Sequence, residues 1–168
     1  VPSTGMRDDY QYPILIGDLL LAKSFESMIK HNLHKWLDAI GDVICRMNEG
    51  RTDKLKWRER GFVSIEERLD EIAKEYAQLP ALAGRISANL AKLDEDAEEA
   101  LSGFGYYSGM LHGLIKERLS QKEKYLEHCE NYLAVLPAKL AADLRALILE
   151  PMLRQLSQLK FKMEAKTL

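Results

Sequence analysis

Two adjacent carboxylates near the start of the chain, Asp8 and Asp9, are the first residues whose types could do chemistry. Magnesium ions prefer carboxylate oxygens as ligands. An Asp-Asp-x-x-Asp motif would place a third aspartate at position 12, where the chain has Tyr12. The motif is therefore incomplete, and we interpret the pair as solvated. We predict no catalytic residue and no metal ligand in this chain.

Two further stretches carry groups that could bind a ligand. His31 and His34 are too far in sequence from other candidate ligands to predict a zinc site, so we interpret them as surface residues. The segment 51–62 is dense in charge and places Trp57 among basic residues. It could bind a phosphate, but a solvated connection between helices is the simpler interpretation.

Gly105, Gly109 and Gly113 follow one another at four-residue spacing, which places them on one face of a helix. Each glycine costs about 1 kcal/mol relative to alanine in a helix interior. Three on one face indicate that something approaches that face closely. Close packing of another helix is the default interpretation, and a ligand chain is the alternative.

The elements that position these residues are all predicted to be helices, because apolar residues recur at three- and four-residue steps and no strand-like alternation occurs. Ser64 and Glu67 form a capping box, and acidic residues from Asp94 onward suit a helix start. We expect breaks near Gly50 and Pro80. The predicted fold is an all-α bundle of about six to seven helices. We expect a single domain over residues 1–168, with an irregular lead-in at 1–13 and a basic tail at 160–168.

The segment from Ile14 to Phe25 is the most apolar in the chain. At a helical turn of about 100° per residue, its few charged residues fall within one narrow arc. A helix that is apolar over most of its circumference is buried on most sides. We therefore expect a central core helix over residues 14–29, with part of its apolar surface facing another polypeptide as the alternative.

The composition is that of an ordinary globular protein, with 46% apolar and 30% charged residues. The formal net charge of −2 provides no basic field for nucleic acid. Cys45 and Cys129 occupy apolar periodic positions and are interpreted as reduced core residues of a cytoplasmic protein. Neither a signal peptide nor a membrane-spanning stretch is predicted.

Several segments in order resemble trans-polyprenyl diphosphate synthases. Residues 17–23, Gly-Asp-Leu-Leu-Leu-Ala-Lys, resemble the family's Gly-Asp-Tyr-Leu-Leu-Ala-Arg segment. Residues 48–50 resemble its Glu-Gly-Glu-x-x-Gln region, and residues 66–90 its helix pair with a Lys-Thr-Ala motif. Residues 99–109 resemble its Ala-Leu-x-x-Phe-Gly-x-x-Leu-Gly segment, and residues 133–137 its late Leu-x-x-Leu-Pro. The resemblance covers roughly residues 5 to 150 and implies a truncated isoprenoid-synthase-like fold.

The residues that do chemistry in this family are altered here. The synthases ionise an allylic diphosphate with magnesium ions held by two aspartate-rich motifs. The second motif falls at residues 116–120, where Lys116 and Ser120 replace carboxylates, and Gly113 replaces the preceding glutamine. The Lys-Thr pair that contacts diphosphate corresponds to Glu75 and Tyr76, and a glutamine corresponds to Lys54. The first aspartate motif would precede residue 1.

The resemblance therefore implies a non-catalytic small subunit of a two-component long-chain polyprenyl diphosphate synthase, similar to component I of heptaprenyl diphosphate synthase. Its partner would be a catalytic large subunit that carries the magnesium, in a heterodimer, and the product would be a precursor of a quinone side chain such as that of menaquinone. Family members pair through the helix that starts at the Gly-Asp segment and the helix after it. The implied interface residues are Leu15, Leu19, Phe25, Trp36 and Ile40. The glycine face at Gly105, Gly109 and Gly113 would border the tunnel that receives the growing isoprenoid chain.

Two alternatives remain open from the sequence. The chain could be the C-terminal portion of a longer polyprenyl or terpene synthase, with a degenerate metal site at Glu117, Glu123 or Asp94. It could also be an unrelated helical interaction module that forms a homodimer through residues 33–47.

Overall fold

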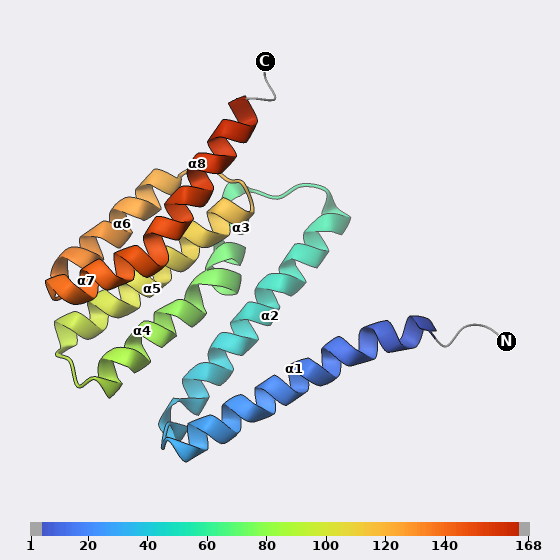
Figure 1. The fold of residues 1–168 in the computed structure, drawn as a ribbon. Helices are drawn as coiled ribbons and strands as arrows, with labels where there is room; N and C mark the ends of the chain where they lie inside the picture. The colour runs from blue at the N-terminus through green and yellow to red at the C-terminus, as the bar shows by residue number, and fades with distance from the viewer. Residues whose placement is uncertain (1–4, 165–168) are drawn as a thin grey trace. The chain divides into compact units, whose positions relative to one another are not determined.

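A computed structural model describes residues 5–164, and all regular structure in this range is helical, which confirms the all-α prediction (Figure 1). The α-helices are α1 (Gly5–Lys30), α2 (Leu37–Arg60), α3 (Ile65–Ile72), α4 (Gln78–Leu90), α5 (Glu95–Lys116), α6 (Lys122–Val135), α7 (Ala138–Leu144) and α8 (Glu150–Glu164). Three shorter elements complete the order: the 3₁₀ turn η1 (His34–Trp36) and the π-helical turns η2 (Ala73–Ala77) and η3 (Arg145–Leu149).

The chain divides into two compact units, residues 1–38 and residues 39–168. The prediction of one domain over the whole chain therefore stays a prediction, and the units are described separately. The first contains α1 and η1. The second contains nearly all of α2 and every later helix.

The first unit differs from its sequence prediction in two ways. Residues 1–13 were expected to be an irregular lead-in, but α1 begins at Gly5 and runs through Pro13. Proline removes one helical hydrogen bond, and this helix continues despite that loss. The expected core helix over residues 14–29 is not buried within this unit, where Leu15 is 64% exposed, Leu20 64% and Ile29 65%. The basic tail at 160–168 is helical as far as Glu164, and its later residues lie outside the described range.

In the second unit, α2 continues ten residues beyond the glycine at which it was expected to end. Gly50 is buried, and a β-carbon there would lie 3.0 Å from the Cβ of Lys74 and 3.3 Å from the backbone oxygen of Glu71. The glycine thus permits close approach of α2 to the following helix. The segment 51–60, predicted to belong to a solvated connection, is therefore part of α2.

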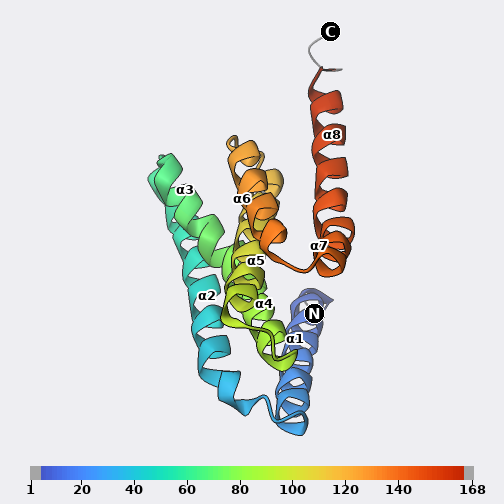
Figure 2. The ribbon, with the colours of Figure 1, turned by 90° about the vertical axis from the view of Figure 1, so that its left-hand side faces the viewer.

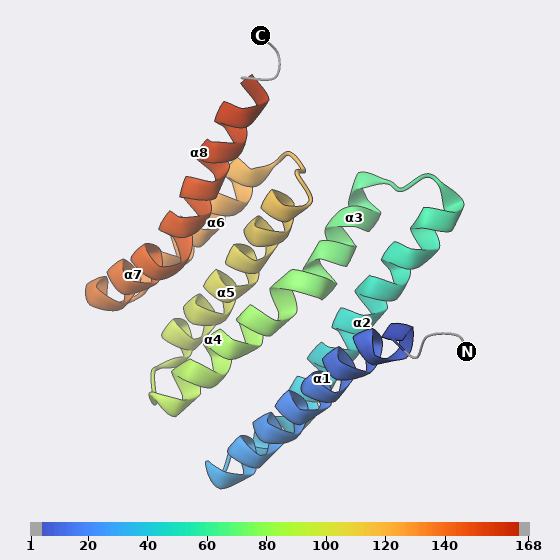
Figure 3. The same cartoon turned by 45° about the vertical axis from the view of Figure 1, so that its right-hand side comes forward.

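Pro80 was expected to break or restart a helix, but α3, η2 and α4 form one continuous bent segment (Figure 3). Proline cannot donate to the carbonyl four residues before it, which here belongs to Tyr76. A π-helical turn changes the hydrogen-bond spacing and accommodates such a lost bond. The π-turn η2 ends at Ala77, three residues before Pro80 of α4. The π-turn η3 ends at Leu149, two residues before Pro151 of α8.

The helix starts predicted from side-chain caps are confirmed. The Ser64 hydroxyl accepts a hydrogen bond from the backbone N–H of Glu67 at 3.1 Å, and the Glu67 carboxylate accepts one from the backbone N–H of Ser64. Asp94 caps α5 by accepting a bond from the Ala97 backbone N–H at 2.9 Å. These caps fix where α3 and α5 begin.

The second unit is built around α5, which packs against both α4 and α6 (Figure 2). Phe104, Leu111 and Leu114 of α5 are each at most 2% exposed. Cys129 of α6 is fully buried in the same core, whereas Cys45 is exposed, contrary to its predicted core position. No helix in the described part of the chain is long and apolar enough to cross a membrane.

The three glycines of α5 face the α3–η2–α4 segment. A β-carbon at Gly105 would collide with the backbone oxygen of Pro80, and one at Gly109 with the backbone oxygen of Tyr76. At Gly113 it would meet the Ile72 side chain at 2.5 Å. The structure therefore shows the close helix packing that the glycine spacing indicated.

This packing predicts opposite effects for two glycine-to-alanine substitutions in the second unit. Gly109→Ala should destabilise the fold by about 1–3 kcal/mol, because the added methyl group overpacks a helix contact. Gly41→Ala is the matched control, since a β-carbon there meets nothing within 4 Å. That variant should gain roughly 0.5–1 kcal/mol, because alanine is the better residue for a helix interior. Urea unfolding would measure both, and equal effects would contradict the close approach.

Candidate functional site

The α2 helix, the α3–η2 segment and the end of α5 meet at a cluster of charged side chains. Lys54 of α2 lies at its centre. Its Nζ donates a hydrogen bond to Oε1 of Glu117 at 2.6 Å. The same Nζ lies 3.6 Å from Oε1 of Glu71 and 3.9 Å from Oε2 of Glu75. One ammonium group thus faces three carboxylates, which come from α3, from η2 and from the residue that follows α5. We call Lys54, Glu71, Glu75 and Glu117 the charge cluster.

The local environment perturbs both members of the short ion pair. Burial alone would lower the pKa of Lys54, but the hydrogen bond to Glu117 and the nearby carboxylates raise it overall. Burial alone would raise the pKa of Glu117, but the hydrogen bond and charge of Lys54 and the charge of Arg68 lower it overall. Arg68 donates to the other oxygen of Glu117 at 3.2 Å. Both groups of the pair are therefore held in their charged forms.

Glu71 is the least satisfied member of the charge cluster. Its side chain is 1% exposed, and neither carboxylate oxygen has a hydrogen-bond partner. Burial first, and then the neighbouring carboxyl group of Glu75, raise the pKa of Glu71 to about 7. This buried setting without donors favours the protonated form of the carboxyl group.

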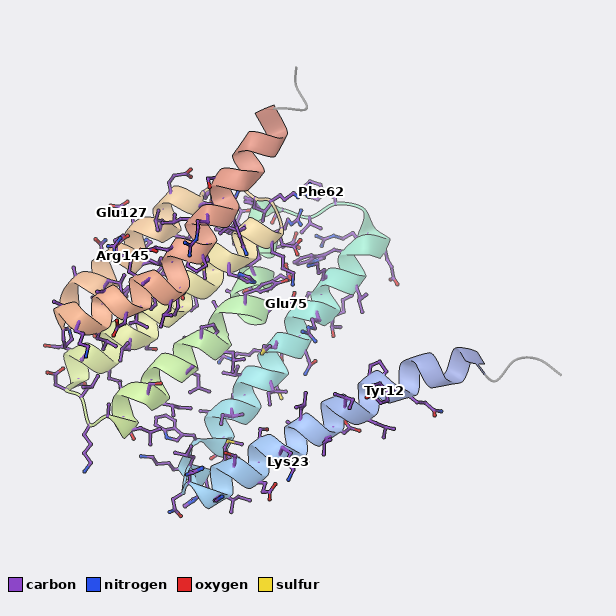
Figure 4. All side chains as sticks on the ribbon, in the orientation of Figure 1. Tyr12, Lys23, Phe62, Glu75, Glu127 and Arg145 are labelled. Carbon is purple, nitrogen blue, oxygen red and sulfur yellow. The ribbon has the colours of Figure 1, made fainter. Side chains whose placement is uncertain are left out.

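Further charged residues form ion pairs next to the charge cluster. Arg51 of α2 lies 3.4 Å from Oε1 of Glu75. Figure 4 shows Glu75 projecting from the α3–α4 segment on the side of α2. Lys74 joins the same two elements by its ion pair with Asp53 of α2 at 3.3 Å, and it also pairs with Asp70 on its own side at 2.6 Å. Ion pairs therefore contribute to the attachment of this half of α2.

The cluster gathers the positions at which this sequence departs from the synthase motifs. Lys54, Glu75 and Glu117 were assigned from three separate segments, and the structure brings them together. Lys116 lies with its Nζ 5.2 Å from the centre of the Tyr76 ring, so the positions of the second aspartate motif and of the Lys-Thr pair are also in contact.

A metal site from Asp94, Glu117 and Glu123 does not form in the structure. Asp94 caps the start of α5 and Glu117 follows its last residue, so a 22-residue helix separates them. Glu117 is bound by Lys54 and Arg68. Among the residues whose side chains the structure describes, no group of three histidines, cysteines or acidic residues is placed to hold a metal ion.

An apolar cavity of about 450 Å³ lies between α4, α5 and the α7–η3 segment. None of its lining residues is charged. Its walls include Leu101, Phe104, Leu140, Leu144 and Ile148, with Gly105 at its border. Of the three glycines predicted to border a tunnel, Gly105 alone lines this cavity, while Gly109 and Gly113 lie against η2 and α3.

The predicted interface residues fall in both units. Leu15, Leu19 and Phe25 of α1 are 64%, 54% and 39% exposed, respectively. Trp36 in η1 and Ile40 in α2 are partly buried. The Nζ of Lys35 lies 5.4 Å from the centre of the Trp36 ring. In α1, Tyr12 and Lys23 (labelled in Figure 4) are exposed as well.

Sequence analysis did not identify Glu71 as a member of this site. Arg68, Glu71 and Glu75 recur at steps of three and four, which places them on one helix face beside the apolar stripe. That spacing was the available signal. The burial of Glu71 depends on α2 packing beside it, which periodicity within one helix does not report.

Comparison with known proteins supports the resemblance found in the sequence. The chain is 31% identical over 110 residues to a geranylfarnesyl diphosphate synthase of Natronomonas pharaonis, covering 62% of this chain and 32% of that protein. It is 30% identical over 102 residues to a geranylgeranyl pyrophosphate synthase of Geoglobus acetivorans, covering 58% and 32%. It is 27% identical over 118 residues to heptaprenyl diphosphate synthase component 2 of Bacillus subtilis, covering 70% and 34%.

These curated relatives are isoprenyl diphosphate synthases, so the chain is homologous to that family over about 60% of its length. The chain spans about a third of the length of the relatives it matches. No protein-family model matches the sequence, and no solved structure matches it significantly.

The charge cluster predicts unequal roles for two lysines on α2. Lys54→Met removes the ammonium from three carboxylates and should destabilise the second unit by roughly 1.5–3 kcal/mol, the range for a hydrogen bond to a charged group. Lys56→Met is the matched control, because Lys56 is 71% exposed and its ion pair, with Asp53, is longer at 3.6 Å. The control should change stability by less than about 0.5 kcal/mol. Urea unfolding at neutral pH would separate the two, and similar losses would argue against a structural cluster.

Proposed function

We propose that this chain is the non-catalytic small subunit of a two-component long-chain polyprenyl diphosphate synthase. The observation that carries the proposal is the charge cluster. At the positions where a synthase needs groups for magnesium and diphosphate, this chain has side chains that bind one another. Lys54 neutralises Glu117, and Lys116 lies over an aromatic ring.

The chemistry of the reaction supports a division of labour. Loss of diphosphate from an allylic substrate requires cations placed where negative charge develops. Magnesium in turn requires free carboxylate oxygens. Here Glu117 is occupied by Lys54 and Arg68, and Glu75 reverses the charge of the family's diphosphate-binding lysine. In our proposal, the catalytic partner subunit supplies the magnesium and ionises the substrate.

The apolar surface of α1 supports a protein partner. Tyr12, Ile14, Leu15, Leu19 and Leu20 are each more than half exposed. Contiguous exposed apolar surface of this kind marks protein interaction sites. In our proposal, Leu15, Leu19 and Phe25, with Trp36 and Ile40, form the contact with the large subunit.

One relative supports the two-component arrangement by its name. The Bacillus subtilis protein is a numbered component of heptaprenyl diphosphate synthase. We propose that this chain acts in an assembly of the same kind and serves the synthesis of a quinone side chain such as that of menaquinone. The match to isoprenyl diphosphate synthases also disfavours an unrelated interaction module.

The apolar cavity supports a role in receiving the product. Its volume of about 450 Å³ lies within the range of small-molecule sites. An uncharged apolar lining suits a hydrocarbon chain and does not suit a diphosphate. We propose that the cavity beside Gly105 accommodates part of the growing isoprenoid chain.

The proposed interface predicts that Leu19→Glu abolishes assembly. A buried charge at an interface position should weaken binding to the large subunit at least tenfold, since loss of a central contact costs about 2 kcal/mol or more. The measurement is the affinity for the candidate large subunit from the same genome, together with isopentenyl diphosphate incorporation by the mixture. Ser24→Glu, which adds the same charge on the opposite side of α1 from Leu15 and Leu19, is the control and should bind normally. Equal affinities for the two variants would remove α1 from the interface.

The proposed chain site predicts that Ala83→Leu shortens the product. Ala83 lines the cavity and is solvent-exposed, so a leucine there fills the space without the backbone collision expected at Gly105. Product lengths from the two-subunit mixture would be compared by chromatography. Ala134→Leu, at an exposed α6 position away from the cavity, is the control. An unchanged length distribution in Ala83→Leu would show that the chain does not enter this cavity.

A further inference from the structure

Glu71 and Glu75 are one helical turn apart. Glu71 lies at the end of α3, and Glu75 lies in the π-turn η2 that follows. Their carboxyl groups approach the same ammonium group, with Oε1 of Glu71 at 3.6 Å and Oε2 of Glu75 at 3.9 Å from the Nζ of Lys54. Both oxygens of Glu71, and Oε2 of Glu75, are buried without a donor. Two ionised carboxylates in such contact would repel each other, and buried oxygens without donors are costly.

The surrounding charges do not resolve this shortage of donors. The charged and titratable groups that face the pair are Lys54 and Arg51 of α2, Arg68 and Tyr76 of the α3–η2 segment, and Lys116 and Glu117 at the end of α5. Lys54 makes its short bond to Glu117, at 2.6 Å, and lies 3.6 Å or more from the pair. Arg51 approaches only Oε1 of Glu75, and Arg68 binds Glu117.

We propose that Glu71 and Glu75 share one proton in the folded protein at neutral pH, and that this proton allows Lys54 to hold α2 against the α3–η2 segment. The proton comes from water and converts one carboxylate into a hydrogen-bond donor for the other. With the proton in place, Lys54 and Arg68 balance the two remaining negative charges of the charge cluster. Without it, the cluster holds an additional buried negative charge.

The stability contribution of this proton has a defined pH dependence. The pKa of Glu71 is raised from an ordinary 4.5 to about 7 in the folded state. The folded state therefore binds more protons than the unfolded state between these values. The stabilisation is full below the unfolded pKa and is lost as pH rises to the folded pKa. The electrostatic attachment of α2 should consequently weaken as pH rises from about 4.5 to about 7, and it should change little above that.

The direct test is a carbon-13 NMR titration of the glutamate carboxyl groups in the full chain from about pH 5 to pH 9. The wild-type protein should show one carboxyl group, assigned to Glu71 by its absence in Glu71→Gln, that titrates near neutral pH. Lys54→Met should move that midpoint upward, because it removes the cation that favours the ionised form. Glu75→Gln should move it downward, because it replaces a negative neighbour with an amide donor. Glu127→Gln, at an exposed position on α6, is the control and should leave it unchanged.

Hydrogen exchange of the backbone amides of α2 tests the structural consequence. Between about pH 6 and pH 8, wild-type protection around Lys54 should fall about tenfold after correction for the intrinsic rate, whereas Glu71→Gln should retain its protection. If Glu71 instead titrates below about pH 5, as an exposed carboxylate does, the proposal is overturned. Shifts of the midpoint in the same direction for Lys54→Met and Glu75→Gln, or equal loss of α2 protection in Glu71→Gln, would overturn it as well.

Discussion

The second unit depends on how closely α5 approaches the α3–η2–α4 segment. Gly105 and Gly109 lie against the backbone carbonyls of Pro80 and Tyr76, where no side chain fits. Pro80 leaves the Tyr76 carbonyl without its usual helical donor, and the π-turn η2 accommodates the change. Glu75 lies in this turn and Glu71 just before it, so the close helix contact and the charge cluster involve the same stretch of backbone.

The charge cluster connects this geometry to function. Prenyl transfer needs free carboxylates for magnesium and free cations for diphosphate. At the positions that resemble the synthase motifs, this chain has both acidic and basic side chains. Lys54 pairs with Glu117 at 2.6 Å, and Glu71 is buried beside Glu75. Groups that neutralise one another stabilise a scaffold and are poorly suited to binding metal and substrate. A supporting subunit with an exposed apolar helix and an apolar cavity fits this arrangement.

The sequence was sufficient to predict the helical class, the caps at Ser64 and Asp94 and the tight glycine face, because each depends on short-range spacing. It was insufficient where tertiary contacts override local preference. Gly50 was expected to end a helix, but its cost of about 1 kcal/mol is small beside the packing it permits. The apolar periodicity of α1 and the position of Cys45 predicted burial, yet periodicity does not specify what covers a face. Family resemblance located Lys54, Glu75 and Lys116, whereas Glu71 required the structure.

The central claim is that this chain supports prenyl transfer without performing it. The most direct measurement is magnesium-dependent incorporation of isopentenyl diphosphate into a farnesyl diphosphate primer, by the purified chain alone and by its mixture with the large subunit from the same genome. The account predicts no incorporation by the chain alone and long-chain product from the mixture, at a rate above that of the large subunit alone. Incorporation by the chain alone would contradict it, and would mean that the charge cluster opens to admit metal and diphosphate.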